Sequence, residues 1–133
     1  MNPDFTSRFL DSVSHAMLKP VYESIIHGDF DRFGDLLADD VEMEIRGAGA
    51  MDGTWRGRSQ VVEAARINFA QVADQKPEIE SIVSEGDSTA LLFRESGVFR
   101  AAGRDYRARA VQWFRFAGGK VSRIDEIVAF FPE

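Results

Sequence analysis

The chain has 133 residues, 44% of them hydrophobic, which suits a single domain over residues 1–133 with one packed core. Its formal net charge of −6 argues against nucleic acid and anionic membranes as partners. The absence of cysteine excludes disulfides, thiolate metal sites and a cysteine nucleophile.

The first third of the chain predicts helices. Apolar residues at helical spacing predict a helix over residues 4–19. Pro20 predicts a break or the first turn of a second helix, which ends at Gly28. A third, short helix follows, with Asp29 or Asp31 able to cap its start. No apolar run reaches the length of a membrane span and no signal-peptide pattern is present, so we expect a cytoplasmic location.

The rest of the chain predicts one long helix and a sheet. Alternating residues predict a half-buried strand over 41–47, and a glycine-rich loop separates it from a helix over 59–75. Four further strands are predicted, with tight turns joining the last three: 78–85, 89–100, 105–117 and 120–130. Helices followed by an antiparallel meander predict an α+β fold with helices on one sheet face. The inward stripe of the long helix is predicted to be Val62, Ala65, Phe69 and Val72.

One residue in the strand LLFRESGVF (91–99) breaks its pattern. Glu95 lies in the same period-2 row as Phe93, Gly97 and Phe99. Because an unpaired buried charge is costly, such a glutamate must be protonated, paired or facing a cavity, unless this end of the strand is exposed.

Three segments carry a resemblance to a known family. The stretches HGDFDRFGDLLADDVEMEI, GTWRGRSQVVEAA and RAVQWFRFAGGKVSRIDEI resemble the nuclear-transport-factor-2-like superfamily, and more narrowly SnoaL-like proteins and ketosteroid isomerases. The resemblance implies a strongly curved, mostly antiparallel sheet packed on N-terminal helices as a cone around a mostly apolar pocket. It also implies a homodimer through the outer sheet face, where Val111, Trp113 and Ile127 are too apolar for a solvated surface.

The steroid isomerase mechanism does not fit this sequence. The aspartate base of those enzymes corresponds to Ile45, which cannot abstract a proton. Their protonated aspartate corresponds to Gln112, and their helix tyrosine corresponds to Val21 or to the adjacent Tyr22.

The resemblance places three polar groups, Glu95, Gln112 and Glu126, on the pocket side of the sheet. Glu126 takes the place of an aspartate of SnoaL-like cyclases and is the predicted acid/base, with burial raising its pKa. Gln112, with Tyr22, would donate to a developing oxyanion. Glu95 would share a proton or a water with Glu126. The pocket wall is predicted to comprise Ile45, Trp55, Phe93, Phe99, Phe114 and Ile124, with Trp55 closing the mouth.

Each of these residues also has a purely structural interpretation. Glu126 could be salt-bridged to Arg46 or Arg94, and a register slip by one residue would turn Glu95 to the other face. Gln112 could be a satisfied buried amide, Tyr22 a core aromatic residue and Trp55 ordinary packing.

Three functions therefore stand beside one another. The first is a cofactor-independent isomerase or cyclase that moves protons on a hydrophobic carbonyl compound, with no metal and no cofactor. The second is epoxide opening, which in this family uses an arginine between two carboxylates, whereas the residue two before Glu95 is Phe93. The third is a non-catalytic ligand-binding or assembly domain. If the protein is an enzyme, we expect Glu95 or Glu126 to face an enclosed cavity without a bidentate arginine partner. If it is a binder, we expect arginine to neutralise these acids or side chains to fill the cavity.

Overall fold

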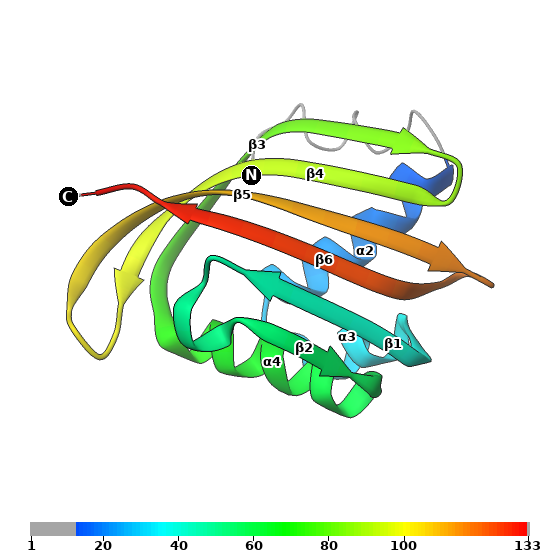
Figure 1. Ribbon diagram of the computed structural model, residues 1–133, viewed down its shortest axis with the longest axis horizontal. Coiled ribbons are helices and arrows are strands. Elements are labelled where there is room, and N and C mark those ends of the chain that lie inside the picture. The colour runs from blue at the N-terminus through cyan, green and yellow to red at the C-terminus, as the bar shows by residue number, and fades with distance from the viewer. Residues whose placement is uncertain (1–12, 133) are drawn as a thin grey trace.

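The computed structural model describes residues 13–132, and of residues 13–15 only the backbone. Three helices lie behind a curved sheet of six strands (Figure 1). The helices are α2 (Val13–Ile26), α3 (Phe30–Asp35) and α4 (Gly57–Gln71), with a short 3-10 turn η1 (Gly49–Met51). The strands are β1 (Leu37–Arg46), β2 (Gly53–Arg56), β3 (Val72–Glu85), β4 (Ser88–Phe99), β5 (Arg104–Ala117) and β6 (Lys120–Phe130).

The sheet confirms the predicted α+β class. Its strand order is β2-β1-β6-β5-β4-β3, with all neighbours antiparallel except β1 and β6, which run parallel. The last four strands form the predicted meander because short glycine-containing turns join β4 to β5 and β5 to β6. The β4–β5 hairpin bends towards the helix layer at the left of Figure 1, which gives the sheet a concave and a convex face.

The predicted break at Pro20 is wrong. Helix α2 runs through this residue without interruption, although proline removes one backbone donor and its ring crowds the preceding turn. Leu18 and Val21, on either side of it, are completely or almost completely buried and lie on one face with Tyr22. Tertiary packing of this apolar face therefore outweighs the local cost of the proline. The part of the predicted first helix before Val13 lies outside the described residues.

Two boundaries around α4 also differ from the prediction. The helix ends at Gln71, not at Gln75, and β3 begins at once with Val72. Its buried stripe is shifted by one residue, with Val61 and Ala64 buried and Val62 and Ala65 half-buried. The four-residue edge strand β2 was not predicted, because it lies in a short polar segment between the loop and the helix.

The core fills most of the space between sheet and helices. On β1 the side chains of Val41, Met43 and Ile45 are buried, as the alternation predicted. They pack with Phe33 of α3 and Phe114 of β5 in one apolar cluster. Residues of this cluster also line the cavity between the sheet and the helices.

Candidate functional site

A divided cavity lies between the concave sheet face and the helices. Its first part, the Ile45 lobe, has a volume of about 60 Å³; the second, the Glu95 lobe, has about 90 Å³. The Ile45 lobe is lined mainly by β1, α4 and the middle of β5 and β6, and the Glu95 lobe by α2, β3, β4 and the ends of β5 and β6. Both lobes are lined by Gln112 and Glu126, so these two residues stand where the lobes meet.

Glu126 and Gln112 form a directly paired unit on neighbouring strands. They are opposite each other in the β5–β6 register, and Gln112 Nε2 donates to Glu126 Oε1 at 2.8 Å. Burial raises the pKa of the Glu126 carboxyl, the Gln112 hydrogen bond opposes this, and the negative charge of Glu95 adds to the rise. The result is a carboxyl that holds its proton more tightly than an exposed glutamate does.

Glu95 points into its lobe and accepts two hydrogen bonds. Gln75 Nε2 donates to its Oε1 at 2.6 Å, and the Tyr106 hydroxyl donates to its Oε2 at 2.7 Å. Burial raises the pKa of the Tyr106 hydroxyl above its ordinary value, and the bond to Glu95 and the charge of Glu95 raise it further. Tyr106 therefore stays protonated and remains a hydrogen-bond donor at neutral pH.

The sequence analysis missed Gln75 and Tyr106. A bulge in β3 brings Gln75 inward: Ala73 pairs with Val98 and Lys76 with Ser96, so that Asp74 and Gln75 together lie opposite Gly97 alone. Gly97 also makes room for the tyrosine, because a Cβ there would lie 2.8 Å from Tyr106 Cε1. Tyr106 lies in the same period-2 row of β5 as Gln112, so the alternation could have predicted that it faces the cavity.

The predicted wall residues divide between the two lobes. Ile45, Phe114 and Ile124 line the Ile45 lobe, and Phe93 and Phe99 line the Glu95 lobe. Trp55 lines neither lobe. It is half-buried on β2, opposite Met43, and its indole N–H donates to the Met51 carbonyl at 3.2 Å, so it holds η1 against the strand. The expectation that Trp55 closes the mouth of the pocket does not match this position.

Tyr22 reaches the Glu95 lobe from α2. Its side chain is 6% exposed, and burial raises the pKa of its hydroxyl, with a further contribution from the charge of Glu95. The charge on Glu95 thus influences Tyr22, Tyr106 and Glu126, which come from three different elements.

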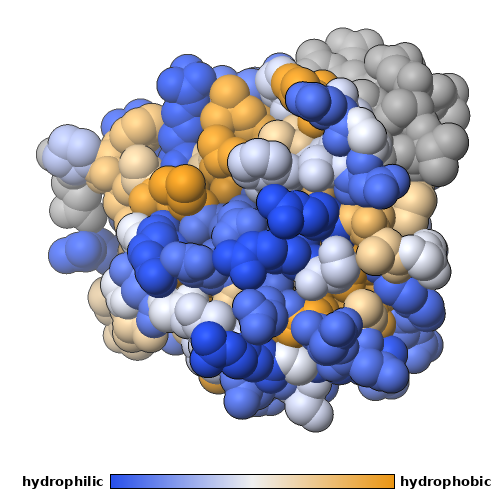
Figure 2. All heavy atoms as spheres, turned by 45° about the vertical axis from the view of Figure 1, so that its right-hand side comes forward, coloured by the Kyte–Doolittle hydropathy of each residue, from blue (hydrophilic) through white to orange (hydrophobic). Residues whose placement is uncertain are grey.

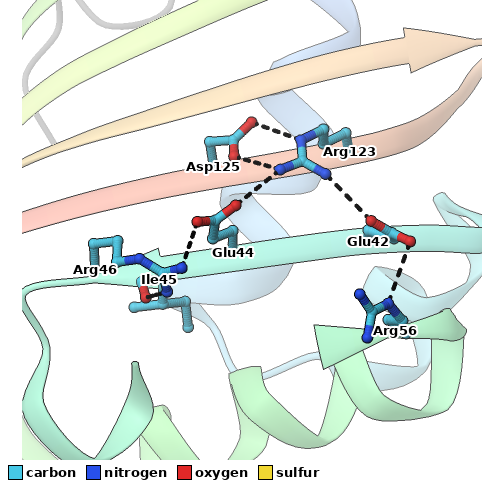
Figure 3. Close-up of polar contacts among 7 residues, drawn as sticks. All are labelled: Glu42, Glu44, Ile45, Arg46, Arg56, Arg123 and Asp125. Atoms are coloured by element: carbon cyan, nitrogen blue, oxygen red, sulfur yellow. Dashed lines mark hydrogen bonds and ion pairs between the residues drawn. The ribbon is translucent and has the colours of Figure 1, made fainter. Parts of the chain in front are cut away.

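The arginines considered as partners of Glu126 are occupied on the convex face. Arg46 Nη2 pairs with Glu44 at 2.7 Å, and Arg94 Nε pairs with Glu80 at 2.6 Å. Figure 3 shows the wider network on β1, β2 and β6, in which Arg123 contacts Glu42, Glu44 and Asp125. In the part of the chain that the structure describes, no ion pair joins Glu95 or Glu126 to a basic side chain.

The convex face also carries exposed apolar side chains. Trp113 is 47% exposed and Ile127 63%, while Val111, which is on β5 with Trp113 and opposite Ile127 of β6, is half-buried. On the side of the molecule that Figure 2 presents, a hydrophilic band crosses the middle and hydrophobic patches border it.

Comparison with known proteins establishes the family. The model of the SnoaL-like domain matches residues 19–124. The chain belongs to the SnoaL-like domain family. No protein of curated function matches the sequence significantly. No helix among residues 13–132 is both long and apolar enough to cross a membrane.

Solved structures share the fold at low sequence identity. An NTF2-like protein from Burkholderia thailandensis is 16% identical, with 89% of this chain and 92% of that chain covered and a TM-score of 0.78. A candidate SnoaL-like polyketide cyclase from Jannaschia is 14% identical, with 86% and 84% covered and a TM-score of 0.76. A protein with a ketosteroid isomerase-like fold from Catenulispora acidiphila, in complex with trimethylamine, is 15% identical, with 83% and 82% covered and a TM-score of 0.70. These likenesses establish the NTF2-like cone fold.

Proposed function

We propose that this SnoaL-like domain binds a small, largely apolar carbonyl compound and moves a proton on it, as in an isomerisation or a cyclisation, without a cofactor. One observation carries the proposal: the Glu126 carboxyl lies in an apolar cavity, receives a hydrogen bond from the Gln112 amide and has a raised pKa. Because burial raises its pKa, this carboxyl is better suited to general acid/base work at neutral pH than an exposed glutamate is.

The proposed step uses groups that the chain itself supplies. Glu126 takes a proton from the carbon next to the carbonyl group, the electron pair moves to the carbonyl oxygen, and the same carboxyl returns the proton to another carbon. Gln112 has a second amide N–H that can donate to the oxygen as negative charge develops there. Tyr22 is a further donor, since its raised pKa keeps its hydroxyl protonated.

The position of Glu126 offers a replacement for the base that Ile45 cannot supply. The two residues are partners in the parallel β1–β6 register, and both line the Ile45 lobe. A carboxyl on β6 therefore reaches the same space as an acid on β1 would.

The test is hydrogen exchange at carbon, which requires no knowledge of the natural substrate. Small ketones such as cyclopentanone are incubated with the protein in D₂O, and deuterium incorporation next to the carbonyl is followed by NMR. Glu126→Gln should lower the exchange rate by about 100-fold or more, because the amide cannot accept the proton. Glu44→Gln, the same change on the convex face of β1, should leave the rate unchanged.

The outcomes separate the proposal from its alternatives. Unchanged exchange in Glu126→Gln, or no exchange above the rate in buffer, would remove the acid/base role. Ketone binding without exchange would favour the non-catalytic ligand-binding alternative. Epoxide opening is the weakest of the three, because no arginine is among the described residues that line either lobe.

We also propose that a second copy of the chain covers the convex face at Val111, Trp113 and Ile127. Isolated indole and isoleucine side chains are common on surfaces, but Val111 and Ile127 are directly paired and Trp113 is on the same face, so the three form a contiguous apolar patch. We further propose that the protein is cytoplasmic, as expected from the sequence.

A further inference from the structure

Among residues 13–132, the side chains that line the cavity include acidic ones and no basic ones. Glu95 and Glu126 line the Glu95 lobe, and Glu126 alone lines the Ile45 lobe. No lysine, arginine or histidine is among the described residues lining either lobe. A charge removed from water is costly unless hydrogen bonds and an opposite charge compensate it. Among the described residues the compensation comes from neutral donors, Gln75, Tyr106 and Gln112, and that part of the wall supplies no positive counter-charge.

Glu95 is held in one orientation by an arrangement that involves three strands. The β3 bulge supplies Gln75, β5 supplies Tyr106, and the missing side chain at Gly97 lets the tyrosine lie against β4. A carboxylate can accept about four hydrogen bonds, and these two donors leave part of that capacity for a ligand. The carboxylate is therefore fixed before a ligand arrives, which lowers the entropic cost of binding.

Aromatic rings line the same lobe as this carboxylate. Phe99 and Tyr106 stack with their centroids 4.5 Å apart, and Phe130 packs against both, at 5.7 Å and 6.0 Å. Tyr22 and Phe93 complete the aromatic part of the lobe. The faces of aromatic rings attract cations, and most strongly where water is excluded.

We propose that the ligand carries a positive charge, as a protonated amine or a quaternary ammonium group, which lies against Glu95 and the aromatic rings. The neutral, apolar part of the same molecule extends past Glu126 into the Ile45 lobe. This inference rests on the proposed function in that it names the substrate class of the same cavity. Anionic ligands are rejected, because they would meet two carboxyl groups and no compensating charge.

The volume of the cavity limits the size of the ligand. A cavity of about 150 Å³ holds one benzene molecule. The lobes measure about 60 Å³ and 90 Å³, so the ligand has roughly the bulk of a single small ring.

Three probes of one shape and different charge test the inference: tert-butylammonium, tert-butanol and trimethylacetate. Binding to the whole chain is measured by NMR titration at neutral pH. The cation should bind at least tenfold more tightly than the alcohol, and trimethylacetate should not bind. In Glu95→Gln the advantage of the cation over the alcohol should fall below about twofold, with the affinity for the alcohol unchanged.

Two further variants control for a general effect of removing an acid and for a failure of Glu95→Gln to fold. Glu44→Gln removes an acid from the convex face and should retain the wild-type preference. Tyr106→Phe keeps the aromatic ring but removes one donor to Glu95, and should lower the affinity for the cation severalfold even if Glu95→Gln fails to fold.

Equal or tighter binding of the alcohol, a preference that survives in Glu95→Gln, or no binding of any probe would overturn the inference. Its failure is distinguishable from failure of the proposed function. Loss of carbon exchange in Glu126→Gln without any preference for the cation would leave the acid/base role in place. A preference for the cation without exchange would leave the ligand class in place.

Discussion

Acidic residues have different partners on the two faces of the sheet. On the convex face, Glu42, Glu44 and Asp125 surround Arg123, and Glu80 lies between Arg94 and Arg109. On the concave face, Glu95 and Glu126 contact amides and a tyrosine hydroxyl. The convex pairs are partly exposed, so each ion pair costs little free energy to form, whereas the concave acids line a cavity and have no basic partner among the described residues. Stability explains the first arrangement and does not explain the second, which is why the concave face is the candidate site.

The largest expected effect concerns the apolar patch of the convex face. Trp113→Glu should convert the proposed dimer into a monomer, because the introduced charge would have to be buried against the second copy. Size-exclusion chromatography with light scattering measures the mass. Ala70→Glu, which places the same charge at an exposed residue of helix α4 on the other side of the sheet, should leave the proposed dimer intact. A monomeric wild type would remove the convex face as an interface.

The next effect concerns the concave face at Gly97. An alanine Cβ would lie 2.8 Å from the Tyr106 ring and 3.0 Å from the Ala73 carbonyl oxygen, so the tyrosine must move away from Glu95. Gly97→Ala should lower the free energy of unfolding by about 1–3 kcal/mol, as overpacking does elsewhere. Urea denaturation measures this, with Ser96→Ala on the opposite face as the control. A change below about 0.5 kcal/mol would show that the tyrosine is not confined there.

The dependence of stability on pH tests the raised pKa of Glu126 on the concave face. Because burial raises the folded-state pKa of Glu126 above its ordinary 4.5, deprotonation favours the unfolded chain. Below pH 4.5 the group is protonated in both states and costs nothing; stability falls as the pH rises from there through the folded-state pKa. Glu126→Gln should therefore match wild type in acid and become progressively more stable than wild type towards neutral pH.

This comparison is made from urea unfolding at a series of pH values. The titratable groups that face Glu126 are Glu95, Tyr22 and Tyr106, and both tyrosines have raised pKa values that keep them neutral in this range. A difference between the variants that is independent of pH, or that shrinks towards neutrality, would contradict a raised pKa.

The smallest effect concerns the ion pairs of the convex face. Arg123→Met should cost about 1 kcal/mol or less of unfolding free energy, since the Arg123 side chain is 30% exposed and its pairs are screened. The loss should shrink further in 1 M NaCl. Arg115→Met, directly opposite on β5, is the matched control and should change stability less. A loss that is unaffected by salt would point to packing of the arginine stem in place of charge.

Much of this architecture could be predicted because it follows from local periodicity. Alternation predicted the strands, and the family resemblance predicted that Ile45, Glu95, Gln112 and Glu126 share the pocket side of the sheet. All four line the lobes of the cavity. Trp55 could not be placed, because its position depends on an edge strand only four residues long.

Gln75 could not be found by periodicity at all. The helical pattern extends to this residue, whereas the chain leaves the helix at Val72 and then makes a bulge with Asp74 in a left-handed conformation, at φ 53°. Which of these two conformations is more stable depends on pairing with β4, a contact between distant parts of the sequence. The alternation of β5 could have predicted that Tyr106 faces the cavity. It could not have predicted the hydrogen bond to Glu95, which depends on the absence of a side chain at Gly97.

The parallel pairing of β1 with β6 has a consequence for how such domains change their chemistry. Side chains at one level of two adjacent strands open onto the same volume, as those of Ile45 and Glu126 do. An acidic group can thus be lost from one strand and gained on its neighbour while the surrounding wall keeps its shape. An acid that lines this lobe can therefore be supplied from either strand, and its position in the sequence can differ.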